Sequence, residues 1–182
     1  MPMNKIILFC FLFLWIGLHP IAAISLEKQS TVGQKIRQAI QGKNATVGVA
    51  FSIDGQLFTF NDEHRYPLMS VFKLHVAIAA LQKMENECVA LDSLRFIESS
   101  QIHKNTYSPL RELYPEGNFY LSYADLMRYT VSQSDNNACD ILIDYLGGID
   151  IVKDRIDKLG ITNYNLTETE ETMHSRISNC YN

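Results

Sequence analysis

Two short motifs supply the residue types of a nucleophilic catalytic site. Ser70 and Lys73 are three residues apart, in a stretch over 70–84 that contains neither glycine nor proline. Residues three apart on a helix lie on the same face, so the Lys73 ammonium would lie beside the Ser70 hydroxyl. A serine hydroxyl is a weak nucleophile until a neighbouring base accepts its proton. The pair is therefore typical of attack on a carbonyl carbon, with the Ser70 backbone N–H available to the developing oxyanion.

The second motif is Ser134-Asp135-Asn136, which lies between two predicted helices. The Ser134 hydroxyl could pass a proton to a leaving nitrogen, and the Asn136 amide could hold an amide of the substrate. Either motif alone has an ordinary explanation, because helices often carry Ser and Lys three apart and S-D-N often forms a turn and cap. Both motifs in this order favour a catalytic site.

The two motifs and their surroundings resemble class A serine β-lactamases, within the wider group of serine penicillin-recognising enzymes. S-x-x-K and S-D-N are two of the three signature motifs of that group. Further similar segments are 67–70, 106–109 and 129–137. The resemblance covers roughly everything after the N-terminal apolar segment. It implies an α/β (α+β) fold in which a helical lobe adjoins an antiparallel sheet flanked by helices, here with the C-terminal strands missing.

The resemblance also implies a role for each site residue. Ser70 would be the acylated nucleophile, Lys73 its proton acceptor or electrostatic partner, and Ser134 the proton relay to the β-lactam nitrogen. Asn136 would contact the acylamide group of the substrate. Tyr107 resembles the aromatic residue that walls the entrance, although an ordinary surface aromatic is an alternative interpretation.

A glutamate that activates the deacylating water is the remaining requirement of the family. Glu168, Glu170 and Glu171 are the candidates, and Glu170 is favoured because Met173-His174 resembles the extended-loop branch of the family. A solvated acidic loop is the structural alternative. Whether this glutamate or the lysine is the base for acylation is disputed for the family and stays open here.

The third family motif, K-T-G or K-S-G, is absent. Lys158-Leu159-Gly160 is a superficial match that ends a predicted helix. The corresponding strand of the family binds the substrate carboxylate and supplies the second oxyanion donor, and loss of one such donor lowers turnover by roughly a hundred- to a thousand-fold. We therefore expect a truncated chain with low or no hydrolytic activity. We also expect it to aggregate, through exposed strand edges and an uncovered helix over 70–84.

Two other functions remain open beside hydrolysis of β-lactam antibiotics, which would confer antibiotic resistance. One is a penicillin-binding or D-alanyl-D-alanine peptidase-like protein, which would use Ser70 and Lys73 on cell-wall peptides. The other is a non-catalytic remnant. An activating glutamate separates the first from a β-lactamase, so Glu170 favours the hydrolase.

The first 23 residues have the order of a secretory signal peptide. Lys5 precedes an apolar run over 6–18, and the small pair Ala22 and Ala23 follows. The run is shorter than the about 20 residues of a membrane span, although a signal anchor is the alternative. We expect a signal peptide at 1–23, a partial β-lactamase-like catalytic domain at 24–182, and an exported, periplasmic protein with no stable membrane anchor after cleavage.

Composition limits the partners. The chain of 182 residues carries a formal net charge of −4, whereas a nucleic-acid binder needs a clustered basic face. No C-x-x-C pair or spaced histidine pair indicates zinc, and we expect no cofactor. Cys10 lies in the signal, and Cys139 and Cys180 are interpreted as small buried thiols. The expected partner is a small-molecule β-lactam, bound by a monomer.

Local patterns predict the elements that carry these residues. Alternation over 47–53, an Asp54-Gly55 turn and a second apolar run over 57–60 predict a hairpin, for which no further strand partner is evident. Ser122 and Asp125 form a weak capping box. The predicted helices are the low thirties to 40, 70–84, one starting after 122, one capped by Asn136 or Asn137, and 151–159. Residues 161–182 are predicted to form a loop.

Overall fold

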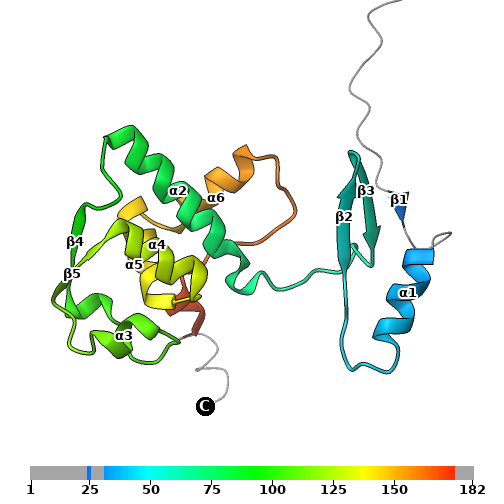
Figure 1. Ribbon diagram of the computed structural model, residues 1–182, viewed down its shortest axis with the longest axis horizontal. Helices are drawn as coiled ribbons and strands as arrows, with labels where there is room; N and C mark the ends of the chain where they lie inside the picture. Colours follow the sequence, from blue (N-terminus) through cyan, green and yellow to red (C-terminus); the bar gives the residue numbers. More distant parts are fainter. Residues whose placement is uncertain (1–23, 26–30, 175–182) are drawn as a thin grey trace, which may run out of the picture. The chain divides into compact units, whose positions relative to one another are not determined.

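The computed structural model describes residues 24–25 and 31–174 (Figure 1). The chain forms two compact units, residues 1–67 and 68–182. The predicted signal peptide, Cys10 and Cys180 lie outside the described residues. No helix in the described ranges has the length and apolar character needed to cross a membrane.

The first unit contains the predicted hairpin. Strands β2 (Val49–Ile53) and β3 (Gln56–Phe60) pair antiparallel, with Phe51 opposite Phe58. Asp54 and Gly55 both have positive φ, 51° and 76°, as a two-residue type I′ turn requires. Strand β1 (Ile24–Ser25) pairs parallel with β3, so the expectation of no further strand partner was wrong. Helix α1 (Thr31–Ile40) has the predicted position.

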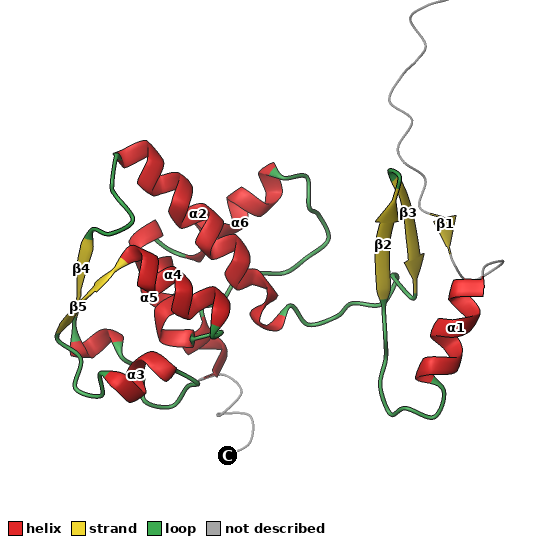
Figure 2. Cartoon of the chain, viewed as in Figure 1, coloured by secondary structure: helices red, strands yellow, loops and turns green. Residues whose placement is uncertain are grey.

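The second unit is mainly helical, as Figure 2 shows. Helix α5 (Asn136–Leu146) packs against α2 (Phe72–Glu87) and α4 (Tyr123–Ser132), and α6 (Ile149–Lys158) packs against α2 and α5. Their apolar faces form one core in which Val76, Leu126, Leu142 and Val152 are fully buried. This core fixes the starts of α2 and α5, where the two motifs lie.

Two caps set the helix starts around the second motif. Ser122 accepts the backbone N–H of Asp125 at 3.1 Å, as the capping box predicts. Helix α5 is capped by Asp135, whose carboxylate accepts the backbone N–H of Ala138 at 2.9 Å. The prediction of Asn136 or Asn137 as the cap was therefore wrong, and Asn136 is instead the first helical residue.

A small sheet at the edge of this unit was not predicted. Strands β4 (Leu94–Ile97) and β5 (Phe119–Ser122) pair antiparallel, and a 3₁₀ turn, η2 (Ser99–Gln101), follows β4. Each strand has only four residues, so neither shows enough alternation to be recognised. The short helix α3 (Pro109–Leu113) starts behind the cap Ser108.

Candidate active site

Ser70 and Lys73 lie one turn apart at the start of α2. Ser70 belongs to a 3₁₀ turn, η1 (Met69–Val71), and Lys73 is the second residue of α2. The predicted helix from Ser70 therefore begins with a tighter turn, closed by the Val71 N–H to the Leu68 carbonyl at 3.0 Å. The Ser70 side chain is exposed to solvent, whereas Lys73 is 2% exposed. The exposed Ser70 and the buried Lys73 thus belong to the same turn at the start of α2.

The Lys73 ammonium is held by the second motif and by a glutamate. It donates to the Ser134 carbonyl at 2.7 Å, to Ser134 Oγ at 3.4 Å and to Asn136 Oδ1. Glu170 Oε1 lies 3.1 Å from Lys73 Nζ. Among the described residues, none of the hydrogen bonds of this ammonium goes to Ser70. Four predicted site residues therefore converge, and Ser70 adjoins them through the helix turn.

Glu170 approaches Lys73 as an ion pair without an aligned hydrogen bond. Its side chain is 12% exposed, and Oε1 is buried with no hydrogen-bond partner in the described part of the chain. The ion pair and the missing hydrogen bond are compatible, because an ion pair requires only that the two charges lie close together, whereas a hydrogen bond also requires alignment. Oε1 therefore keeps lone-pair capacity for a further donor.

A short helical turn over 170–174 positions this glutamate, in a segment predicted to be loop. Thr169 and Thr172 cap the turn reciprocally, through Thr169 N to Thr172 Oγ1 at 2.9 Å and Thr172 N to Thr169 Oγ1 at 3.3 Å. Asp140 on α5 accepts the backbone N–H groups of Glu170 and Glu171, each at 2.9 Å. The turn is therefore held by a carboxylate far away in the sequence, which explains why the local sequence pattern does not predict it.

The three candidate glutamates differ in their partners. Glu170 reaches Lys73, whereas Glu171 Oε2 lies 3.5 Å from His103 Nε2. Glu168 is half-buried. Of these three glutamates, Glu170 is therefore the one placed beside Lys73 in the described structure.

Asp135, the middle residue of the second motif, organises the loop that carries Ser134. It is fully buried and accepts the Ser108 hydroxyl at 3.0 Å and the Leu110 N–H at 2.7 Å, in addition to its capping bond to Ala138. Ser134 itself has φ 54°, a left-handed conformation that costs a serine about 1–2 kcal/mol. The bonds of Asp135 hold the loop in this strained form.

The loop over 103–107 contacts Asn136 of the second motif. Asn136 Nδ2 donates to Thr106 Oγ1 at 2.6 Å, and the Asn136 backbone N–H donates to the Tyr107 carbonyl at 3.1 Å. The Tyr107 side chain is 61% exposed. Tyr107 therefore contributes its backbone to the site framework and leaves its ring on the surface.

Helix α5 also carries a buried thiol, Cys139. Cys139 is fully buried, and burial, reinforced by the nearby Asp140 carboxylate, raises its pKa well above the usual value. The thiol is therefore neutral, as the prediction of a small buried cysteine requires. Cys88 is exposed.

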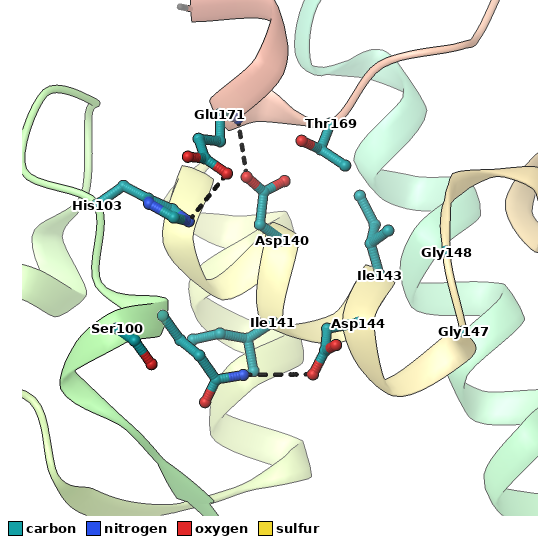
Figure 3. Close-up of a pocket in the computed structure, with 11 residues that line it drawn as sticks. Ser100, His103, Asp140, Ile141, Ile143, Asp144, Gly147, Gly148, Thr169 and Glu171 are labelled. Carbon is teal, nitrogen blue, oxygen red and sulfur yellow. Dashed lines mark hydrogen bonds and ion pairs between the residues drawn. The ribbon is translucent and has the colours of Figure 1, made fainter.

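A cavity of about 550 Å³ lies beside the glutamate turn and contains neither Ser70 nor Lys73. Figure 3 shows Asp140, His103 and Glu171 along one side of it, with dashed contacts from Glu171 to the other two. Gln101 and Asp144 also line the cavity, and Gln101 donates to Asp144 at 3.3 Å. The cavity is therefore lined by Asp140 and Thr169, two of the residues that hold the turn over 170–174.

Lys158-Leu159-Gly160 has no place in this arrangement. Lys158 is the last residue of α6, and Gly160 follows with φ 76°. The segment is thus a helix end, as the sequence predicts.

Comparison with known proteins identifies the class to which this fold and site belong. The model of the β-lactamase enzyme family matches residues 31–179, and the chain belongs to that family. The solved class A β-lactamase of Bacteroides cellulosilyticus DSM 14838 is 46% identical, with a TM-score of 0.76 over 80% of this chain and 53% of that one. The extended-spectrum β-lactamase TLA-3 is 40% identical, with a TM-score of 0.73 over 78% and 52%. The predicted fold class is confirmed.

Curated sequences agree with the solved structures. A β-lactamase of Bacteroides uniformis is 46% identical over 87% of this chain and 54% of its own length. The extended-spectrum β-lactamase PER-1 of Pseudomonas aeruginosa is 32% identical over 78% of this chain and 47% of its own length. The chain spans about half the length of the curated relatives it matches.

Proposed function

We propose that the protein acts on β-lactam antibiotics as a serine hydrolase that forms an acyl-enzyme on Ser70, with low or no turnover in this chain because a K-T-G or K-S-G motif is absent from it. The observation that carries the proposal is the buried Lys73 ammonium, which contacts Ser134, Asn136 and Glu170 within one turn of Ser70. This is the constellation of a nucleophile, a proton-transfer network and a water-activating base.

Acylation uses the first half of this network. The Ser70 oxygen attacks the β-lactam carbonyl carbon, and its proton passes to the Lys73–Glu170 pair. The amide C–N bond of the ring then breaks. The Ser134 hydroxyl, 3.4 Å from Lys73 Nζ, delivers a proton to the leaving nitrogen and recovers one from Lys73. Asn136 contacts the acylamide group of the substrate, and Tyr107 lines the entrance.

Deacylation uses Glu170. Oε1 is buried and accepts no aligned hydrogen bond within the described ranges, so it can accept one from a water molecule. Removal of a proton from that water generates the nucleophile that hydrolyses the Ser70 ester. A penicillin-binding protein lacks this need, so the proximity of Glu170 to Lys73 favours a β-lactamase over a peptidase.

The setting of the reaction follows from the sequence. We propose export to the periplasm through a signal peptide at 1–23, and a catalytic domain at 24–182. In this proposal the mature protein is a monomer that has no membrane anchor, acts on a small-molecule β-lactam and needs no cofactor.

Intact-mass spectrometry of the mature chain with a chromogenic cephalosporin, with colour release followed in parallel, tests the proposal. We expect one substrate adduct that is absent in Ser70→Ala and persists in Glu170→Gln. Ser132→Ala is the matched control, because Ser132 is an exposed serine at the end of α4. An adduct that survives Ser70→Ala would overturn the assignment of the nucleophile, whereas no adduct together with no colour release would leave the non-catalytic remnant as the function.

A further inference from the structure

The Arg111 side chain donates hydrogen bonds to three backbone carbonyls of the loop that contacts Asn136. Arg111 Nη1 donates to the carbonyls of His103 at 3.2 Å, Lys104 at 2.5 Å and Thr106 at 2.8 Å. Three carbonyl dipoles that converge on one point repel each other, and a cation between them removes that repulsion. Within the described residues, none of these carbonyls accepts a backbone N–H, and only the His103 carbonyl has a second side-chain donor, Asn137 Nδ2 at 3.2 Å.

The carbonyl bonds fix the residue that orients Asn136. Thr106 carries both a carbonyl bound by Arg111 and the hydroxyl that accepts Asn136 Nδ2 at 2.6 Å. Because Nδ2 is bound on this side, Oδ1 faces the Lys73 ammonium. A loosened loop would free the Asn136 amide to rotate.

The backbone of Arg111 is anchored independently of its side chain. Arg111 lies in α3, and its N–H donates to the cap Ser108 at 3.1 Å. Ser108 and Leu110 both donate to the buried Asp135. Removal of the guanidinium therefore frees the carbonyls of Lys104 and Thr106, whereas His103 stays bound to the buried Asn137 and the start of α3 stays attached to the core.

We infer that Arg111 is a positioning residue for substrate recognition, because its guanidinium holds the loop at Lys104 and Thr106 and thereby orients the Asn136 amide toward the acylamide group of a β-lactam. The inference rests on the proposed function for the substrate and on the hydrogen bonds alone for the orientation of Asn136. Arg111 touches neither Ser70 nor Lys73 within the described structure, so its effect passes through Thr106 and Asn136.

Two substrates and three variants test the recognition step. Arg111→Met keeps most of the side-chain length without charge, Arg111→Lys keeps a cation with three donors, and Arg128→Met removes an exposed arginine on α4 as the control. We expect Arg111→Met to raise KM about ten-fold for a penicillin with an acylamide side chain, the equivalent of one hydrogen bond. For 6-aminopenicillanic acid, which lacks that acyl group, KM should change less than about two-fold by the same reasoning, with kcat nearly constant for both.

Two rescue experiments, a lysine at position 111 and added guanidinium, test the same inference. Arg111→Lys should recover most of the KM, and millimolar guanidinium should partly restore Arg111→Met, since the carbonyl cluster stays available to a cation. An equal loss with both substrates, or no loss with either, would overturn the inference.

A readout without turnover separates this inference from the proposed function. In ¹H–¹⁵N spectra, the Asn136 side-chain NH₂ signals, assigned by their loss in Asn136→Ala, should shift or broaden in Arg111→Met and stay in place in Arg128→Met. Unchanged signals would refute the positioning role even in an active enzyme. A shift in a chain that does not react with β-lactams would support the positioning role and refute the proposed function.

Discussion

The Asp140 carboxylate on α5 accepts the backbone N–H of Glu170 at 2.9 Å, and its second oxygen accepts the next N–H at the same distance. Burial raises the pKa of Asp140 from 3.8 to about 6, and these two hydrogen bonds oppose the rise. The residue that holds the glutamate turn is therefore itself a titrating group close to neutral pH.

The first prediction concerns stability against pH. The folded pKa of Asp140 is raised, so the folded state binds more protons than the unfolded state between about pH 4 and 6, and stability falls as the pH rises through that window. A rise from 3.8 to about 6 corresponds to about 3 kcal/mol. Asp140→Asn removes this titration and keeps one acceptor oxygen. We expect the melting temperature of Asp140→Asn, measured by circular dichroism, to increase relative to that of the native protein as the pH rises from 4 to 7.

The same titration should affect the reaction. A protonated Asp140 carboxyl turns one acceptor oxygen into a donor, so the Glu170 turn loses one of its two supports below about pH 6. We expect an acidic limb in the deacylation rate that is absent in Asp140→Asn. Glu170, Glu171 and His103 face the same region, so His103→Gln serves as the control. A limb that vanishes in His103→Gln and persists in Asp140→Asn would contradict the assignment.

The second prediction concerns Glu170→Gln. The amide cannot accept a proton from water, so deacylation should slow by about 100- to 10,000-fold, the usual contribution of a general base. Mass spectrometry should then find a long-lived adduct on Ser70. Glu171→Gln is the matched control, because that side chain pairs with His103 instead of Lys73. Comparable slowing in the control would show that the acidic turn acts through its overall charge.

The third prediction concerns Asp135. Replacement by alanine leaves the Ser108 hydroxyl and two backbone N–H groups without their acceptor in a fully buried site. We expect Asp135→Ala to lower the free energy of unfolding by about 3–5 kcal/mol, measured by urea denaturation. Ser122→Ala, which removes the part-buried N-cap of α4, should lose about 1 kcal/mol. Similar losses in both variants would mean that the Asp135 network contributes only as a cap.

Local signals predicted the parts of this fold that depend on neighbouring residues. The Asp54-Gly55 turn and the Ser122 cap were readable because both involve residues within a few positions of each other. The cap of α5 was misplaced because Asp135, Asn136 and Asn137 are all competent caps, and only the buried donors of Ser108 and Leu110 select Asp135.

The supports of the site were invisible for a different reason. Asp140 binds Glu170 across 30 residues, and Thr106 binds Asn136 across the same separation. Neither Asp140 nor Arg111 belongs to a motif or interrupts a helical pattern. The motif residues Ser70, Lys73 and Ser134 could be identified from the sequence, whereas the residues that hold them required the structure.

The last prediction separates the hydroxyl of Ser134 from its backbone. Ser134 has φ 54°, which glycine adopts without strain, and the Lys73 ammonium bonds to the Ser134 carbonyl at 2.7 Å, a contact that needs no side chain. Ser134→Gly should therefore raise stability by up to about 1 kcal/mol. Because the proton relay is lost, acylation should fall by about 100-fold or more.

Ser134→Ala provides the comparison, since alanine loses the hydroxyl and keeps the strain. Stopped-flow acylation and thermal denaturation of both variants should give the same loss of rate and different stabilities. If Ser134→Gly acylates at the native rate, the leaving nitrogen receives its proton from another group. Equal stabilities would instead mean that the left-handed backbone at Ser134 stores no strain.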